Sequence, residues 1–285
     1  MSASATFEGE RARLARLAYR MLGSVAEAED VAQDAWLRWN RAERATIADP
    51  AAWLTRVVTR LCLDRLRAER ARREAYVGPW LPEPLIEDAG DPVERAEDVS
   101  VAFLLALQRL SPLERAAFLL HDVFDEDYAA IARALDRGEV ACRQLLSRAR
   151  AHIKDAKPRF VVPADEAQRL IGAFLQAAAN NDVSGMAALL AEDCLLISDG
   201  GGKRPAALRP MVGREDVMRL IRGLIWRGKA PAIDDIRQAR INGAPGFILR
   251  DSGGVQTIAF EPDADGRLAA IYIVRNPEKL RRVAV

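Results

Sequence analysis

Residues 78–85 of this 285-residue chain, GPWLPEPL, contain three prolines and a tryptophan. Proline lacks a backbone N–H and pushes the residue before it out of the α region, so this stretch cannot continue a helix. A flexible linker would be rich in glycine and serine, and would not contain a tryptophan and two leucines. The segment therefore predicts a stiff apolar connection between separately folded parts, with side chains that need a surface to cover them.

The chain before this segment has the apolar spacing of helices. The spacing predicts helices over residues 7–22, 23–42 and 49–73. Ser24 can cap the second helix, and Pro50 suits the first turn of the third. The second helix has one acidic and polar face, and the third is rich in arginine, so these two helices offer surfaces of opposite charge.

The chain after the segment is helical again. Ser111, Pro112 and Glu114 have the spacing of a capping box with proline at the first helical position. Asp127 can cap a short helix, and residues 136–138 predict a tight turn before a final basic helix. Two helices joined by a tight turn, the second with a polar exposed face, are typical of a helix-turn-helix that binds DNA.

The last 120 or so residues have a different pattern, with helices followed by alternating segments bounded by turns. The strands are expected within 195–202, 233–243, 246–251, 254–262 and 268–275. This pattern predicts an α+β domain in which a curved antiparallel sheet is packed by helices on one side. The predicted fold class is therefore two helical domains followed by an α+β domain.

The distribution of charge tells more than its total, which is only +1. Residues 60–73 carry six arginines against two acids, and residues 137–159 carry seven basic residues against two acids. Between them, residues 83–98 carry seven acids against one arginine. Two basic blocks separated by an acidic spacer suggest two nucleic-acid contacts on one chain.

The cysteines and the apolar residues indicate which other classes of protein the chain does not resemble. Cys62, Cys142 and Cys194 are odd in number and far apart, which indicates reduced, buried thiols and no metal site. The N-terminal residues are polar, and no window approaches eighteen apolar residues, so we expect no membrane segment and a cytoplasmic location. No cofactor is predicted.

Three long motifs resemble known families. AYRMLGSVAEAEDVAQDAWLRW resembles region 2 of extracytoplasmic-function (ECF) sigma factors, of the sigma-70 family. LSPLERAAFLLHDVFDEDYAAIARAL, followed by ACRQLLSRAR, resembles their region 4. FLQAAANNDVSGMAALLAEDCLLISDGGG resembles a SnoaL-like domain. The short motifs WLPEP, DGGGK and NPEKL are similar to those of the ECF subgroup that carries this C-terminal extension.

The resemblance implies region 2 over residues 1–76, a Pro-rich acidic linker over 77–98, region 4 over 99–160 and a SnoaL-like regulatory domain over 165–285. It implies that the chain binds RNA polymerase core, through the β′ clamp and the β subunit, and promoter DNA at the −10 and −35 elements. Transcription would then be regulated in cis by the C-terminal domain, in place of a separate anti-sigma protein.

The resemblance also assigns residues. The face expected to dock on polymerase holds Glu29, Asp30, Gln33 and Asp34. The expected DNA contacts are Arg56, Arg60 and Arg67 at the −10 element, with Arg143, Gln144, Ser147 and Arg148 at the −35 element. The residues expected to hold the linker on the C-terminal domain are Trp80, Leu81, Pro82, Asp199, Gly200, Gly201, Gly202, Lys203, Asn276 and Pro277.

Two other functions stay open. A one-component regulator would combine the helix-turn-helix with a ligand-sensing C-terminal domain, but it has no need of an acidic docking helix followed by a basic one. An enzyme of the SnoaL-like fold would need acid/base residues, yet both histidines lie outside that domain. Asp193, Asp199 and Tyr272 remain there without a telling spacing, so no catalytic residue is predicted. A small ligand in the C-terminal pocket is left open.

Overall fold

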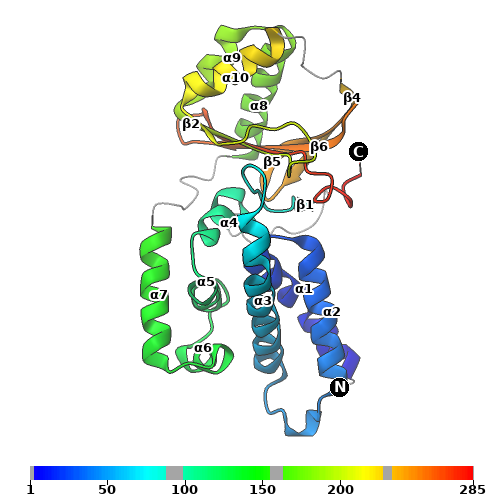
Figure 1. Cartoon of the computed structure of the whole chain (residues 1–285), viewed down its shortest axis with the longest axis vertical. Helices are drawn as coiled ribbons and strands as arrows, with labels where there is room; N and C mark the ends of the chain where they lie inside the picture. Colours follow the sequence, from blue (N-terminus) through cyan, green and yellow to red (C-terminus); the bar gives the residue numbers. More distant parts are fainter. Residues whose placement is uncertain (1–2, 88–98, 155–162, 227–232, 285) are drawn as a thin grey trace. The chain divides into compact units, whose positions relative to one another are not determined.

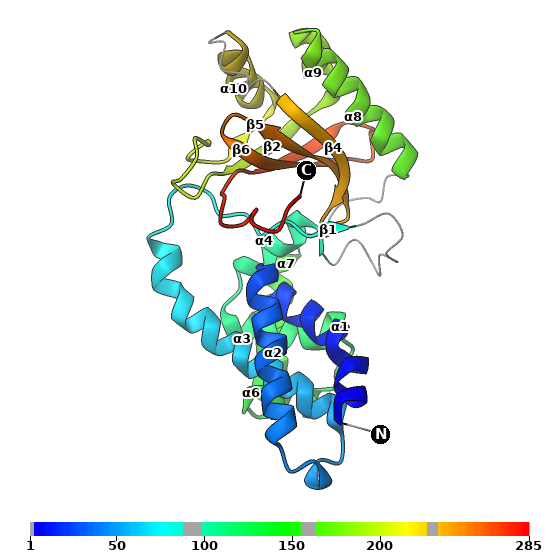
Figure 2. The same ribbon diagram turned by 90° about the vertical axis from the view of Figure 1, so that its right-hand side faces the viewer.

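The computed structural model of the chain describes residues 3–87, 99–154, 163–226 and 233–284. The chain divides into two compact units (Figures 1 and 2). The N-terminal unit comprises Met1–Ala75 and Ala102–Lys157, and the C-terminal unit comprises Tyr76–Val101 and Pro158–Val285. The Pro-rich segment therefore groups with the C-terminal unit, although region 4 follows it in sequence.

The N-terminal unit is built from helices alone in its described part. They are α1 (Ala3–Leu22), α2 (Val25–Arg41), a 3₁₀ turn (Arg44–Thr46), α3 (Pro50–Glu74), α4 (Val101–Gln108), α5 (Pro112–Phe118), a π-helical turn (Leu119–Val123), α6 (Tyr128–Leu135) and α7 (Glu139–Ile153). Helices α1, α2 and α3 pack against one another, and α3 also packs against α5 and α6. The two DNA-binding regions expected from the sequence thus share one compact body.

Local signals in the sequence set the ends of these helices. The backbone N–H of Glu27 donates to Ser24, which caps α2, and Ser111 and Glu114 form a complete capping box on α5. Asp127 caps α6 by accepting from the N–H of Ala130. Asp136 ends α6 in the left-handed conformation with φ of 56°, which aspartate tolerates better than most residues. The tight turn between α6 and α7 is therefore formed as predicted.

The C-terminal unit is an α+β domain, as predicted. Its helices are α8 (Ala164–Ala179), α9 (Val183–Leu189) and α10 (Arg214–Trp226), and its strands are β1 (Ile86–Glu87), β2 (Leu190–Asp199), β3 (Met211–Val212), β4 (Ile233–Ile241), β5 (Ala244–Asp251), β6 (Gly254–Pro262) and β7 (Leu268–Val274). Within the described residues the sheet order is β1-β4-β5-β6-β7-β2-β3.

The sheet is not purely antiparallel, which corrects the prediction. Strands β4 to β7 form an antiparallel meander, but β2 lies beside β7 in parallel register. The cause is the path of the chain, which after β2 forms β3 and α10 and re-enters the sheet at β4, so that the meander from β4 to β7 ends beside β2. Hairpin spacing in the sequence detects the meander but carries no information on a pairing between strands 70 residues apart.

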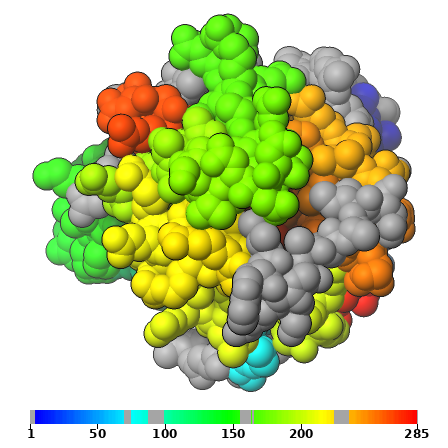
Figure 3. Space-filling model, turned by 90° about the horizontal axis from the view of Figure 1, so that it is seen from above, coloured from blue at the N-terminus to red at the C-terminus, as the bar shows by residue number. Residues whose placement is uncertain are grey.

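The two faces of this sheet have different coverings. Phe260 and Ile271 belong to an apolar cluster with residues of α8, α9 and α10, which cover one face of the sheet. Figure 3 shows the outer surface of these helices, with α8 and α9 beside α10. Because side chains alternate along a strand, Ala259 and Tyr272 point to the other face. There they meet Leu81, Pro82 and Pro84 of the Pro-rich segment.

Candidate nucleic-acid interface

The second helix of the helix-turn-helix presents a polar face to solvent. Arg143, Gln144 and Ser147 are exposed on α7. Cys142, Leu145, Leu146 and Ala149 are buried on its other side. The apolar spacing fixes which side of α7 packs, so the face that sequence reasoning assigned to the −35 element is free of core contacts.

Two arginines of α7 are held by acids of the same unit. Arg148 Nε lies 2.8 Å from Glu114 Oε1, and Arg150 binds both carboxylate oxygens of Asp122. Burial alone would raise the pKa values of Glu114 and Asp122, but hydrogen bonds outweigh it and lower both. The bonds come from Arg148 and Ser111 for Glu114, and from Arg150 and His121 for Asp122. Arg148 remains more than half exposed. Arg148 can therefore bind a phosphate, while its ion pair with Glu114 restricts the orientations of its side chain.

The predicted −10 contacts lie along α3 in different surroundings. Arg67 is exposed and pairs with Asp64 at 3.1 Å. Arg60 is also exposed, and its Nε donates to the carbonyl of Ala134, the penultimate residue of α6, at 3.4 Å. Arg56 is half-buried and lines a cavity. The side chains of the arginine cluster at 70–73 lie outside the described residues.

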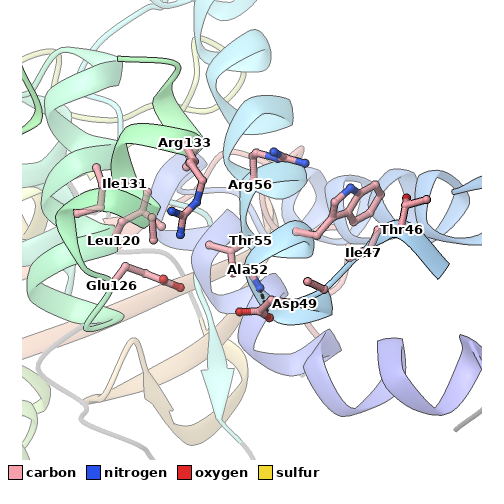
Figure 4. A pocket seen from close by; sticks show the side chains of 14 residues that line it. Thr46, Ile47, Asp49, Ala52, Thr55, Arg56, Leu120, Glu126, Ile131 and Arg133 are labelled. Carbon is pink, nitrogen blue, oxygen red and sulfur yellow. Dashed lines mark hydrogen bonds between the residues drawn. The ribbon is translucent and has the colours of Figure 1, made fainter. Parts of the chain in front are cut away.

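The cavity, of about 450 Å³, lies between the start of α3 and α6 (Figure 4). One side is formed by the loop 46–49 and by Trp53 and Arg56, and the other by Glu126, Ile131 and Arg133. Trp53 also packs on Trp39, with ring centroids 5.5 Å apart. An indole with cationic and anionic groups around it suits a nucleobase, because single-strand binders combine aromatic stacking with polar edges. In this structure α6 covers that site.

The acidic face of α2 divides into two pairs. Glu29 and Gln33 line a groove of about 390 Å³ between α1 and α2, in which the rings of Phe7 and Trp36 are in tilted contact with centroids 5.2 Å apart. Asp34 instead pairs with Arg65 of α3 at 3.0 Å, and Asp30 lies 3.9 Å from the same arginine. The first pair is therefore placed beside apolar surface, and the second pair ties α2 to α3.

The Pro-rich segment is fixed to the C-terminal unit by one carboxylate. Asp199, at the end of β2, is fully buried. It accepts hydrogen bonds from the hydroxyl of Tyr76 at 2.6 Å, the backbone N–H of Leu81 at 2.9 Å, the backbone N–H of Gly201 at 3.0 Å and the ammonium of Lys279 at 2.7 Å. Burial, followed by the bond to Asp199, raises the pKa of Tyr76. The carboxylate thus has donors from the segment, the glycine loop and the C-terminal tail.

The glycine loop leaves no room for side chains at this contact. A Cβ on Gly200 would lie 2.1 Å from the carbonyl of Arg204, and one on Gly201 would lie 2.3 Å from Asn276 Nδ2. Gly201 and Gly202 also have positive φ. Asn276 is buried and donates to the hydroxyl of Tyr76 at 2.8 Å. The loop and the tail therefore enclose the start of the Pro-rich segment.

The remaining predicted residues surround the same contact. Leu81 and Pro82 are buried, and the ammonium of Lys279 lies 4.0 Å from the centre of the Trp80 ring. Lys203 and Glu278 form an ion pair between the loop and the tail. Pro277 is exposed. The ten residues predicted from the short motifs are brought to one place, with Pro277 on its outer side.

Sequence reasoning missed Tyr76, Lys279 and Asn242 at this contact. Asn242 accepts from the N–H of Leu85 and donates to the carbonyl of Val99, so it fixes both ends of the segment that contains residues 86–98. Lys279 is the one basic residue of the NPEKL motif. A buried aspartate needs a positive charge nearby, so Lys279 could have been predicted as a partner of Asp199. Tyr76 and Asn242 have no local signal, because their partners are more than 100 residues away.

The catalytic candidates of the C-terminal unit do not form an active site on the helix-covered face. Asp193 is exposed, Asp199 holds the Pro-rich segment, and Tyr272 donates to Glu261 at 3.0 Å on the opposite face. Within the described ranges, no group of three or more His, Cys, Asp or Glu side chains is placed to hold a metal ion. In the same part of the chain, no helix combines the length and apolarity that crossing a membrane requires.

Comparison with known proteins identifies both helical regions. The family model of sigma-70 region 2 matches residues 6–72, and that of sigma-70 region 4 matches residues 100–153. The ECF RNA polymerase sigma factor SigJ of Mycobacterium tuberculosis is 40% identical, over 96% of this chain and 91% of its own length. The probable ECF RNA polymerase sigma factor SigI of the same species is 34% identical, over 97% of this chain and 94% of its own.

A solved structure extends the similarity to the whole chain. The crystal structure of the extracytoplasmic-function sigma factor SigJ from Mycobacterium tuberculosis matches with a TM-score of 0.78 at 37% sequence identity. The match covers 98% of each chain, and so includes the C-terminal α+β unit.

Proposed function

The chain belongs to the extracytoplasmic-function family of RNA polymerase sigma factors, and from this premise we propose which of its surfaces carry out promoter recognition. It is an alternative sigma factor, an initiation factor and not an enzyme, which binds RNA polymerase core and promoter DNA. Its work on polymerase places it in the cytoplasm. A one-component regulator needs only the helix-turn-helix and would have no use for region 2. The match to region 2 therefore argues against that alternative.

The polymerase surface is the groove between α1 and α2. Glu29 and Gln33 at its rim, beside the aromatic pair of Phe7 and Trp36, suit a partner that is both basic and apolar. The β′ clamp is the partner that we assign to this groove, with the β subunit contacting other parts of the factor. Asp30 and Asp34 act through Arg65, which sets the angle between α2 and α3.

The −35 surface is the exposed face of α7. Arg143 and Gln144 lie in the N-terminal half of this helix, where a recognition helix meets base edges in the major groove. Arginine reads guanine and glutamine reads adenine, while Ser147 and Arg148 suit the flanking backbone. The −10 surface is α3, where Arg56, Arg60 and Arg67 follow the strand and the cavity at Trp53 receives an unpaired base.

The C-terminal unit regulates these surfaces through the Pro-rich segment. The observation that carries this proposal is the fully buried Asp199, which binds Tyr76, Leu81 and Lys279 together. A segment restricted by proline loses little chain entropy when it docks, so the contact holds the chain between regions 2 and 4 in one path. A small ligand of this unit stays a prediction.

Transcription from purified components tests these assignments. The full chain and core polymerase would be given promoter fragments selected by the holoenzyme from a randomised DNA pool. Glu29→Lys should lower the affinity for core, and Trp80→Ala should change transcript yield with core affinity unchanged. Val212→Ala, at an exposed position of the same unit, is the matched control and should behave as the parent. Equal yields from the parent and the Trp80 variant would refute regulation in cis, and an unchanged affinity of Glu29→Lys for core would refute the polymerase surface.

A further inference from the structure

Tyr128 lies at the centre of a row of contacts under the face of α7 that we assign to the −35 element. It is the first residue of α6 and is half-buried. The guanidinium carbon of Arg143, on α7, lies 4.9 Å from the centre of its ring. The ring of His121 lies 4.9 Å away on the π-helical turn, tilted by 47°. The tyrosine therefore contacts the predicted base-reading arginine directly.

The tyrosine ring is itself supported. His121 Nδ1 lies 2.9 Å from Asp122 Oδ1. Asp122 in turn binds Arg150 of α7 through both oxygens, at 2.9 and 2.5 Å. The row from Arg143 through Tyr128, His121 and Asp122 to Arg150 thus begins and ends on α7. Such a closed arrangement limits how far the tyrosine ring can move relative to the helix that reads DNA.

Arg143 needs such a support. Its side chain is 58% exposed, and arginine is long and flexible. Bidentate recognition of guanine requires the planar guanidinium within a narrow range of positions. The other contact of Arg143 is Glu139, one turn earlier on α7, at 3.4 Å. A carboxylate beside the phosphates of a DNA groove is repelled, so this ion pair weakens when DNA binds, whereas the contact with a neutral ring persists.

We propose that Tyr128 is a positioning residue for promoter recognition: its ring holds the guanidinium of Arg143 in the orientation that reads the −35 element. The inference rests on the proposed role of Arg143. The aromatic face is the required feature, because it attracts the cation and restricts its plane. The hydroxyl is not required, and Glu139 is a partner of Arg143 only in the absence of DNA.

The experiment uses holoenzyme assembled from core polymerase and the full chain, selecting from DNA in which the −35 element is randomised. Arg143→Ala identifies the base positions that depend on Arg143. Tyr128→Leu should weaken preference at those same positions by about two- to fivefold and leave the other positions unchanged. Tyr128→Phe should match the parent. Glu139→Gln should keep the base preference and raise the affinity for all sequences.

A tyrosine with a purely structural role would give a different result. Equal loss of preference at every position in Tyr128→Leu, or no loss where Arg143→Ala shows one, would overturn the inference. An unchanged base preference in Arg143→Ala would overturn both the inference and the proposed role of Arg143. The sigma function would still be supported in that case if the holoenzyme selected a particular −35 sequence. If Tyr128→Leu does not fold, His121→Ala removes the support of the ring. It should weaken the same positions to a smaller extent, and an unchanged profile would count against the proposal.

Discussion

Two contacts in this protein join segments that are far apart in the chain, and they are built differently. In the C-terminal unit, the contact of the Pro-rich segment is closed: Asp199 and Leu81 are fully buried, and the glycine loop has no room for a Cβ. In the N-terminal unit, the contact of α3 with α6 contains a cavity of about 450 Å³. A hydrogen bond that crosses this contact is long, with Arg60 Nε 3.4 Å from the carbonyl oxygen of Ala134.

The N-terminal contact is loose only at this end. Near α1 and α5, Arg115 is buried and donates to the carbonyls of Met21 and Leu107 at 2.5 and 2.9 Å. Promoter elements centred at −10 and −35 are roughly 85 Å apart, at about 3.4 Å for each base pair. A compact unit of this size has a radius of gyration of about 14 Å and cannot span that distance. We therefore predict that the α3–α6 contact opens on the promoter, whereas the contact of the Pro-rich segment with the C-terminal unit persists.

The largest expected effect is loss of the Asp199 carboxylate. Asp199→Asn keeps the shape but leaves the largely covered ammonium of Lys279 without its counter-charge, which should destabilise the C-terminal unit by about 3–5 kcal/mol. Hydrogen exchange of the full chain, followed in β2 and β7 across a urea series, would measure the loss. The same experiment should show residues 76–85 exchanging faster, because Tyr76 and Leu81 lose their acceptor.

Asp193→Asn is the matched control, since Asp193 lies on the same strand and is exposed. It should change the unfolding free energy by less than about 0.5 kcal/mol. Equal effects of the two substitutions would show that the carboxylate of Asp199 has no special part in the contact, and the comparison drawn above would fail.

A smaller effect should follow from filling the cavity. Ala130 lines it, so Ala130→Leu adds apolar volume that is buried only while α6 covers α3, favouring the closed form by about 1–2 kcal/mol. Energy transfer between dyes on α2 and α7 would then fall less when core polymerase and promoter DNA are added, and transcripts would start more slowly. Ala129→Leu changes the neighbouring residue, which does not line the cavity, and should behave as the parent. Identical behaviour of the two variants would mean that the contact does not open.

The features that the sequence predicted are those with local causes. Ser24, Ser111 and Asp127 cap their helices because the partner N–H lies three residues away. The composition of the Pro-rich segment predicted that Leu81 needs cover, since stiffness and apolar side chains are both visible in one short stretch. These arguments also predicted correctly which side of α7 is exposed and which side is buried.

The features that it did not predict depend on pairs far apart in the chain. The parallel pairing of β2 with β7 has no signature at either strand. Tyr76 and Asn242 are ordinary polar residues until the fold brings Asp199 and Val99 to them. The cavity at Trp53 arises because α6 packs on α3, which neither helix encodes alone. The motif resemblance named the residues of the linker contact, but their hydrogen bonds required the structure.

The smallest expected effect concerns Glu261, on the sheet face that the Pro-rich segment covers beside Tyr272. Burial raises the pKa of Glu261 more than the hydrogen bond from Tyr272 lowers it. The folded protein therefore binds the proton more tightly than the unfolded chain does. The stabilisation that Glu261 contributes is fully present below the pKa that it has in the unfolded chain. It is lost as the pH rises through the higher pKa that it has in the folded protein.

Glu261→Gln cannot ionise and still accepts from Tyr272, so its melting temperature relative to the parent should rise as the pH increases above the ordinary pKa of a glutamate. Glu192→Gln, on an exposed position of β2, is the control and should show no such trend. The effect also probes the linker contact, because Leu81→Ala would admit water to this face, bring the pKa of Glu261 toward its ordinary value and reduce the trend. A trend that is unchanged by Leu81→Ala would mean that the Pro-rich segment does not seal this face, and that the closed contact is confined to Asp199.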